Sequence, residues 1–99
     1  MLHITDCIYI NETSEKTFEE FETIVLELLP KYNAKILLRL KPTIEQVIKT
    51  EIGIPYEIHI LEFQSEQDFE NYKQDDTRKK FLHLKNESVK SNFTLISKD

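Results

Sequence analysis

The sequence predicts a single α+β domain in which an antiparallel sheet of four strands carries two helices on one face. Three observations support this prediction. In some segments apolar residues alternate with polar ones, which is typical of strands; in others they recur every three or four residues, which is typical of helices. These segments follow in the order strand, helix, strand, strand, helix, strand. The 99 residues suffice for one domain, 1–99, and not for two. The composition, 39% hydrophobic and 31% charged, is that of a folded globular chain.

The first strand and the first helix have the clearest patterns. Residues 2–10 alternate apolar and polar side chains, which predicts a strand whose apolar face is interrupted by Asp6. Ser14 or Thr17 is then expected to cap a helix, because the residues after Thr17 fit a capping box. Within 18–32 apolar residues recur every three or four positions, so this helix should present one apolar stripe to the sheet.

The segment after this helix contains a second strand and an ambiguous stretch. Pro30 lacks a backbone donor and should loosen the last helical turn, and Asn33 suits the left-handed position that ends a helix. Residues 35–41 then predict the second strand. Residues 43–50 are rich in β-branched side chains, yet some of their spacing would suit a helical turn. We expect a bent continuation of the strand there.

The second half repeats the strand and helix alternation. Residues 56–63 predict the third strand, and Ser65 with Asp68 should cap the second helix. Thr77 is expected to cap a further helical turn. Residues 91–97 predict the fourth strand. The second half therefore supplies a strand, a helical segment and a closing strand.

This order of elements is that of a ferredoxin-like βαββαβ domain. Right-handed crossovers place both helices on the same face of the sheet and give the strand order 4-1-3-2, with strands one and three central. Nothing within the chain is left to cover the other face, although apolar residues lie on it. Two copies packed sheet to sheet would bury this open face, so we expect a homodimer.

Charge and composition exclude several functional classes. The net charge of −5 argues against binding to nucleic acid, whose phosphates attract cationic proteins. No apolar run is long enough for a membrane helix, and the N-terminus has no secretory signal, so we expect a cytoplasmic protein without a membrane partner. The single cysteine, the single glycine and the three dispersed histidines predict no disulfide, no glycine-rich phosphate loop and no metal site. We therefore expect no cofactor.

Several segments resemble the dimeric α/β-barrel superfamily, and within it the uncharacterised family DUF1330. The step from Glu62 and Phe63 into Ser65, where a strand leads directly into a capped helix, is the most specific of these segments. The residues that carry the resemblance are Phe18, Phe21, Leu29–Leu37, Ile58–Ser65, Phe69 and Tyr72. The resemblance implies a barrel formed by two subunits, with a cleft beside each sheet. It also implies that an activity, if there is one, would be that of a cofactor-free monooxygenase or isomerase; other members bind haem.

The alternation along each strand assigns residues to the two faces of the sheet. We expect the helices to cover the more apolar face. That face would hold Ile4, Ile8, Ile10, Ile36, Leu38, Leu40, Ile58 and Ile60. The open face would then collect His3, Cys7, Tyr9, Leu37, Arg39, His59, Leu61 and Phe63.

A candidate site follows from this assignment. His59, in the middle of a central strand, is the candidate catalytic residue because an imidazole can act as a general base near neutral pH. Tyr9 and Arg39, from the flanking strands, are candidate ligand-binding residues, and Phe63 would form an apolar wall. Glu62, at the end of the same strand, is a further candidate.

Three functional hypotheses stay open at this point. The first is a pocket near the central strands that binds a small organic ligand, with or without catalysis. The second is a noncatalytic dimeric structural or interaction module, in which His59 packs against the partner. The third is a metal or haem protein, which elemental analysis and an absorption spectrum would reveal. The sequence does not decide whether the protein is an enzyme.

Overall fold

The computed structural model describes residues 1–98 and contains a curved four-stranded antiparallel sheet. The strands are β1 (Leu2–Ile10), β2 (Ala34–Leu40), β3 (Glu57–Phe63) and β4 (Val89–Lys98). Their order across the sheet is β2-β3-β1-β4, and all three neighbouring pairs are antiparallel. The predicted α+β class, the strand order and the central position of the first and third strands are thereby confirmed.

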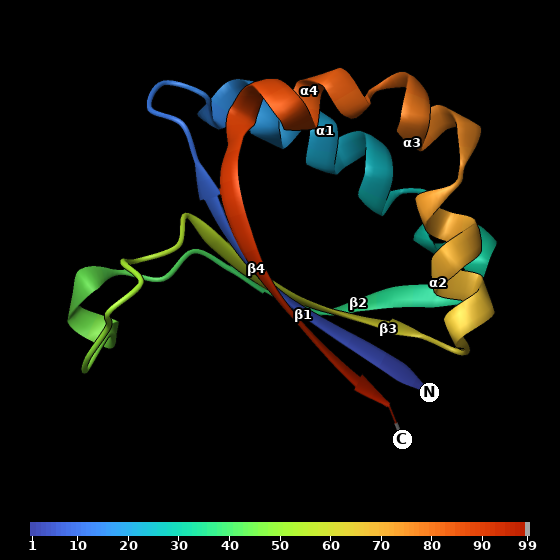
Figure 1. The fold of residues 1–99 in the computed structure, drawn as a ribbon, viewed down its shortest axis with the longest axis horizontal. Helices are drawn as coiled ribbons and strands as arrows, with labels where there is room; N and C mark the ends of the chain where they lie inside the picture. Colours follow the sequence, from blue (N-terminus) through green and yellow to red (C-terminus); the bar gives the residue numbers. More distant parts are fainter. Residues whose placement is uncertain (99) are drawn as a thin grey trace.

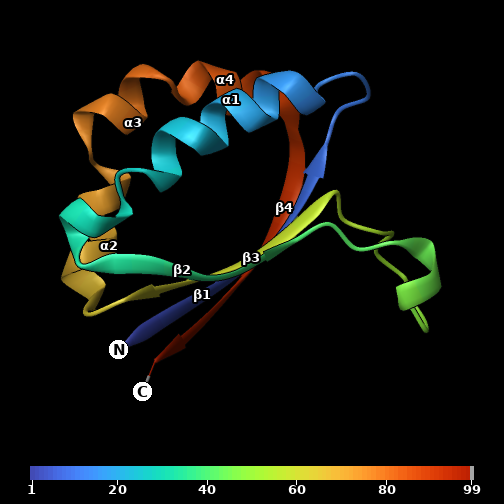
Figure 2. The ribbon, with the colours of Figure 1, turned by 180° about the vertical axis from the view of Figure 1, so that it is seen from behind.

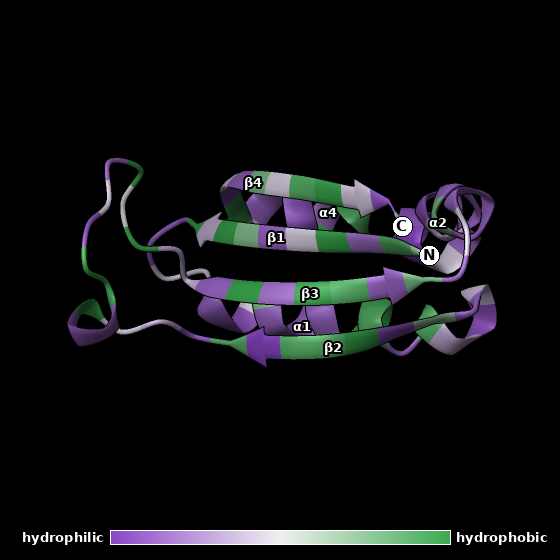
Figure 3. Ribbon diagram, turned by 90° about the horizontal axis from the view of Figure 1, so that it is seen from below, coloured by the Kyte–Doolittle hydropathy of each residue, from purple (hydrophilic) through white to green (hydrophobic). Residues whose placement is uncertain are grey.

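The helices lie together on the concave face of the sheet (Figures 1 and 2). The first crossover is α1 (Glu15–Leu26), followed by a 3-10 turn at Leu29–Tyr32. The second crossover is divided into α2 (Glu66–Lys73), α3 (Asp76–Lys80) and α4 (Leu82–Ser88), where we expected one helix and a further turn. Figure 3 shows the opposite, open face of the sheet with no helix in front of it. Within residues 1–98, no helix is both long and apolar enough to cross a bilayer.

The hydrophobic core lies between the sheet and the helices, toward the end of the sheet that holds the N-terminus (Figure 1). Phe63 is fully buried there and its ring lies 5.1 Å from that of Phe69 and 5.5 Å from that of Tyr72. The buried members of the core are Leu2, Ile4, Phe21, Val25, Leu29, Ala34, Leu61, Phe63 and Tyr72. Aromatic packing of this kind contributes beyond the buried area alone.

Two ends of helices follow the sequence prediction and two do not. Asn33 adopts the left-handed conformation after the turn that contains Pro30, and the Ser65 hydroxyl accepts the backbone N–H of Asp68 as predicted. Of the two residues expected to cap α1, Ser14 occupies the N-cap position, although its side chain makes no capping hydrogen bond; the capping box at Thr17 is wrong, because Thr17 lies inside α1. The cap expected from Thr77 is supplied instead by the Asp75 carboxylate, which accepts the backbone N–H of Arg78.

The segment 43–50 does not continue the second strand. Ile44–Gln46 forms a short 3-10 helix, and the backbone N–H of Thr43 donates to the side chain of Gln46 at 3.0 Å. The segment belongs to a long connection that projects away from the sheet and helices (Figure 1). The local spacing of Ile44 and Val47 on a helical turn therefore prevails over β-branching, because no neighbouring strand is present to hold an extended backbone.

The assignment of sheet faces was right for β1 and wrong for β3. Leu2, Ile4 and Ile8 of β1 face the helices as expected. Because Asp6 pairs with His59 and Ile4 with Leu61, the helix-covered residues of β3 are the odd-numbered ones. Those residues are Glu57, His59, Leu61 and Phe63, all buried. Ile58 and Ile60 lie on the open face instead. The strand has apolar residues on both faces, so alternation alone did not reveal which face the helices cover.

A bulge in β2 explains the remaining error. The pairing with β3 shifts register between Ile36 and Leu38, which leaves Leu37 as an extra residue. Beyond the bulge the faces are exchanged, so Leu38 and Leu40 are on the open face and Arg39 points toward the helices. β-bulges re-aim side chains in this way and are not evident from a pattern of period two.

Candidate functional site

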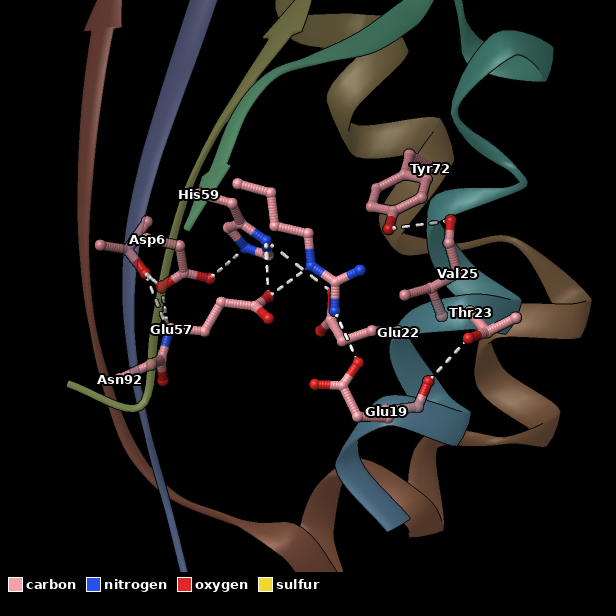
Figure 4. A network of polar contacts seen from close by, with 11 residues as sticks. Asp6, Glu19, Glu22, Thr23, Val25, Glu57, His59, Tyr72 and Asn92 are labelled. Carbon is pink, nitrogen blue, oxygen red and sulfur yellow. Dashed lines mark hydrogen bonds and ion pairs between the residues drawn. The ribbon is translucent and has the colours of Figure 1, made fainter. Parts of the chain in front are cut away.

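A buried cluster of charged side chains lies between the sheet and α1 (Figure 4). Asp6 comes from β1, Glu22 from α1, Glu57 and His59 from β3, and Arg39 from β2. Glu22 and His59 are 4% exposed and Glu57 is 1% exposed. Charged groups are costly to remove from water, so a cluster of them in place of apolar core residues indicates a functional rather than a stabilising role.

One side of the His59 ring faces Asp6. The Nε2 atom of His59 lies 3.6 Å from Oδ2 of Asp6, and Oδ1 of Asp6 accepts hydrogen bonds from Asn92 at 3.2 Å and Thr94 at 3.0 Å. Burial opposes ionisation of Asp6, but the contacts with His59, Asn92 and Thr94 outweigh burial and lower the pKa of Asp6. Asp6 is therefore a carboxylate that fixes the imidazole.

The other side of the His59 ring faces two glutamates. Its Nδ1 atom lies 3.6 Å from Oε2 of Glu57 and 3.8 Å from Oε2 of Glu22. Burial acts to lower the pKa of His59, but the contact with Asp6 and the charges of Glu22 and Glu57 outweigh it, so this pKa is raised. The imidazole is thus held more readily in its protonated form.

Arg39 neutralises one of the two glutamates. Its Nε atom donates to Oε2 of Glu57 at 2.9 Å, and its Nη2 atom donates to Oε2 of Glu19 at 3.0 Å. The hydrogen bond to Glu57 raises the pKa of Arg39 against the opposing effect of burial. Glu57 therefore has a permanent cationic partner within the cluster.

Glu22 is the group in the cluster best suited to exchange a proton. Within residues 1–98 its Oε2 atom is buried and makes no hydrogen bond, and the same is true of Nδ1 of His59. Burial raises the pKa of Glu22 to about 7; the positive charge of His59 opposes this rise, whereas the charge of Glu57 adds to it. A carboxyl group with a pKa near neutrality can both accept and donate a proton under ordinary conditions.

The cluster borders a cavity of about 210 Å³ between the sheet and the helices. Asp6, Glu22 and His59 line it from one side, and Arg78 and Lys85 belong to its helical wall. The apolar lining comes from Ile4, Ile8, Phe18, Phe21, Val25, Leu26, Leu61, Phe69 and Val89. A mostly apolar cavity with a few convergent polar groups is typical of a small-molecule site.

Glu22, Glu57 and His59 also offer donor atoms that lie within 4.8 Å of one another, close enough to share a metal ion. The sequence did not predict this grouping, because only one of the three residues is a histidine. However, the guanidinium of Arg39 already occupies Oε2 of Glu57, and a divalent cation there would be repelled by it. The donor set therefore fits a metal poorly, and we interpret the cluster as one that exchanges protons.

The structure brings together only part of the predicted site. His59 and Arg39 both lie in the cluster, although on the helix-covered face and not on the open one. Phe63 is in the hydrophobic core and does not line the cavity. Tyr9 lies on the open face, with its ring beside Gly53. Glu62 lies on the same face, where its Oε2 atom is 3.0 Å from Nε2 of His3. Tyr9 and Glu62 are therefore separated from His59 by the sheet.

Sequence reasoning missed Asp6, Glu22 and Glu57, yet two of them left a signal. Asp6 interrupts the apolar face of the first strand. Glu22 falls on the apolar stripe of the first helix, four residues after Phe18 and three before Val25. A charged residue at a position that periodicity assigns to the core is a marker of a site. Glu57 left no such signal, because the face of its strand was assigned incorrectly.

Comparisons with known proteins support the fold. No protein-family model matches the sequence, and no curated protein is detectably similar to it. A protein of unknown function from Rhodopseudomonas palustris superimposes with a TM-score of 0.85 at 10% identity, over 99% of this chain and 81% of that one. A protein of unknown function from Bacteroides fragilis, described as dimeric with a ferredoxin-like fold, superimposes with a TM-score of 0.70 at 11% identity. The match covers 99% of this chain and 95% of that one.

A third similar structure is that of a protein from Nitrosomonas europaea, provisionally assigned as an antibiotic biosynthesis monooxygenase. It gives a TM-score of 0.74 at 8% identity, over 100% of this chain and 98% of that one. At such identities these likenesses establish the ferredoxin-like fold and do not transfer an activity.

Proposed function

We propose that the domain binds a small organic molecule in the cavity between its sheet and helices, and that Glu22 exchanges a proton with it. The observation that carries this proposal is that the buried Oε2 atom of Glu22, beside the cavity, and the neighbouring Nδ1 atom of His59 make no hydrogen bond within residues 1–98. Buried polar atoms without partners are uncommon in folded proteins, and a bound molecule would supply the missing hydrogen bonds.

The chemistry that fits this arrangement is isomerisation by proton transfer. Glu22 as a carboxylate would take a proton from a carbon next to a carbonyl group of the ligand, and return it to another atom of the same molecule. Protonated His59, oriented by Asp6, would stabilise the negative charge that develops on the ligand. The step needs no further reactant, whereas the monooxygenase activity that the resemblance also implies would consume molecular oxygen.

The binding proposal is tested with benzamide, a neutral single-ring probe. Titration into isotopically labelled protein should shift the NMR signals of cavity residues such as Val25 and Leu61, with saturation. Val89→Phe places a larger side chain in the cavity wall and should abolish these shifts. Val47→Phe, the same change in the projecting connection, is the matched control and should leave them intact. Shifts that are scattered over the surface, or that survive Val89→Phe, would contradict the proposal.

A second proposal concerns self-association, and it rests on the open face of the sheet. Phe93 and Leu95 of the edge strand β4 are 52% and 57% exposed on that face, and Leu38 and Leu40 of the opposite edge strand, β2, are also exposed. We infer that a second copy covers this face, because contiguous apolar surface of this kind is unfavourable in water. Burial of His59 on the helix-covered face means that this contact would not involve the cluster, so an interaction role and ligand binding are compatible.

A further inference from the structure

Two cationic side chains on the helical wall of the cavity have no carboxylate partner among residues 1–98. Arg78 belongs to α3 and Lys85 to α4, and both line the same cavity as Glu22 and His59. Neither forms an ion pair in the part of the chain that the structure describes. Lys73, by contrast, also lines the cavity but forms an ion pair, because its Nζ atom lies 2.9 Å from Oε1 of Glu70.

Arg78 is held in place by Tyr72 and forms no ion pair with a carboxylate among the described residues. Its guanidinium lies over the ring of Tyr72, 5.2 Å from the centroid, and its Nε atom is buried without a hydrogen-bond partner. The carboxylate of Asp75, which caps the same helix, accepts hydrogen bonds from the backbone N–H of Arg78 and from the side chains of Tyr32 and Lys31. A guanidinium oriented by an aromatic ring and left with a free buried donor is ready to bind an acceptor.

Lys85 adds a second positive charge at the same wall. Burial lowers the pKa of Lys85, and the charge of Arg78 lowers it further, against the weaker opposing charges of Asp6 and Glu22. Two like charges that are partly removed from water and form no ion pair among residues 1–98 raise the free energy of the cavity. An anion bound between them would relieve this cost.

The size and the remaining walls of the cavity define the rest of the ligand. Its volume of about 210 Å³ exceeds the roughly 150 Å³ of an apolar protein cavity known to hold benzene. Phe21, Leu61 and Phe69 supply apolar walls. The space therefore suits one ring, or an aliphatic chain of similar bulk, with a charged group attached.

We propose that the ligand of this cavity is a small organic anion, a carboxylic acid whose carboxylate binds Arg78 and Lys85 and whose apolar body extends toward Glu22 and His59. This inference rests on the proposed function, because it names the class of molecule that the same cavity takes. It explains why a chain of net charge −5 places at the wall of this cavity two cationic side chains that form no ion pair within residues 1–98. It also orients the ligand, since the carboxylate end lies against the helices and the reactive end against the cluster.

The test compares benzoate with benzamide, which has nearly the same shape and no charge. Calorimetric titration should show benzoate binding at least about tenfold more tightly, as expected for charge-assisted hydrogen bonds. Arg78→Met and Lys85→Met should each weaken benzoate at least about tenfold and leave benzamide binding nearly unchanged. Retained benzamide binding shows that each variant is folded. Lys79→Met, an exposed neighbour of Arg78, is the matched control and should change neither affinity.

The possible outcomes separate this inference from the proposed function. If benzamide binds in the cavity but benzoate binds no more tightly, the anion inference is wrong and the binding proposal stands. If benzoate binding survives Arg78→Met and Lys85→Met, or survives Val89→Phe, the anion binds elsewhere and the inference is overturned. If neither probe binds, both proposals fail together.

Discussion

Glu22 shows at the scale of one residue how function and stability conflict. Its position on the apolar stripe of α1 would favour a leucine, and instead a carboxyl group is buried beside Asp6 and Glu57. The pKa of Glu22 is raised to about 7 because burial makes its ionisation less favourable in the folded protein than in the unfolded chain. Residues of this type are retained where chemistry requires them.

The change Glu22→Gln should therefore stabilise the protein at alkaline pH. The pKa of Glu22 is near 4.5 in the unfolded chain and about 7 in the folded protein. The folded protein therefore loses stability as the pH rises from 4.5 to about 7, because ionisation of Glu22 costs more in the folded state. Above that range the full cost is present, at most about 3 kcal/mol for a shift of this size. We expect Glu22→Gln to raise the free energy of unfolding at pH 8.5 by up to this amount, and to change it little at pH 4, as measured by denaturant titration.

The same variant should lose proton exchange. Deuterium incorporation from solvent into a carbon acid such as phenylpyruvate should fall by about 10²-fold or more in Glu22→Gln. Glu20→Gln, an exposed change in the same helix, is the control and should alter neither stability nor exchange. If Glu22→Gln instead has a lower free energy of unfolding than the unmodified protein at pH 8.5, the Glu22 carboxylate stabilises the fold and this prediction is wrong.

At the scale of elements, the bulge in β2 and the divided second crossover build the site. The bulge at Leu37 turns Arg39 toward the helices, where it pairs with Glu57. The breaks between α2, α3 and α4 let the chain bend around the cavity, so that Tyr72, Arg78 and Lys85 all line it. A single straight helix would place fewer of its residues against one cavity, because its inward face is a narrow stripe.

The start of α2 is one element boundary with a simple test. The hydroxyl of Ser65 accepts the backbone N–H of Asp68 at 3.1 Å, which satisfies one of the free donors of the first turn. Ser65→Ala should lower the free energy of unfolding by about 1 kcal/mol, measured by chemical denaturation. Ser91→Ala in β4, an exposed serine that caps no helix, should have little effect. Equal effects of the two changes would show that the cap contributes nothing specific.

The strands and the first helix could be predicted because their signals are local. Periodicity predicted α1 but did not separate it from the 3-10 turn at Leu29–Tyr32 that follows it, and Asn33 and Ser65 were identified from the chemistry of helix ends. The segment 43–50 and the caps at Thr17 and Thr77 were predicted incorrectly, since several polar residues compete for each boundary and a short segment has little periodicity. Asp75, for example, is only two residues from Thr77 and supplies the cap instead.

At the scale of the whole molecule, the sheet separates two surfaces of different composition. The helix-covered face encloses the cluster and the cavity, and the open face exposes apolar side chains of β2 and β4. With this division, the proposed self-association and the proposed ligand binding would use different faces of the sheet. A domain of this size has a thin core, so covering the open face would also add stability.

Self-association is tested directly by mass in solution. Light scattering after size exclusion should give twice the 11.8 kDa chain mass at micromolar concentration. Phe93→Lys combined with Leu95→Lys should give a monomer, because two charges on the open face would be desolvated in the contact. Thr23→Lys, on the exposed side of α1, should leave the mass unchanged. A single-chain mass for the unmodified protein would refute the dimer.

The sequence alone determined the order of the elements, the ferredoxin-like class and the presence of His59 and Arg39 as groups that could carry chemistry. Each of these depends on local periodicity or on the identity of single residues. Only the tertiary structure decided that His59 faces the helices and meets Asp6, Glu22 and Glu57 there. Alternation fixes which side chains of one strand share a face, but the register between strands, and one bulge, decide which face is covered.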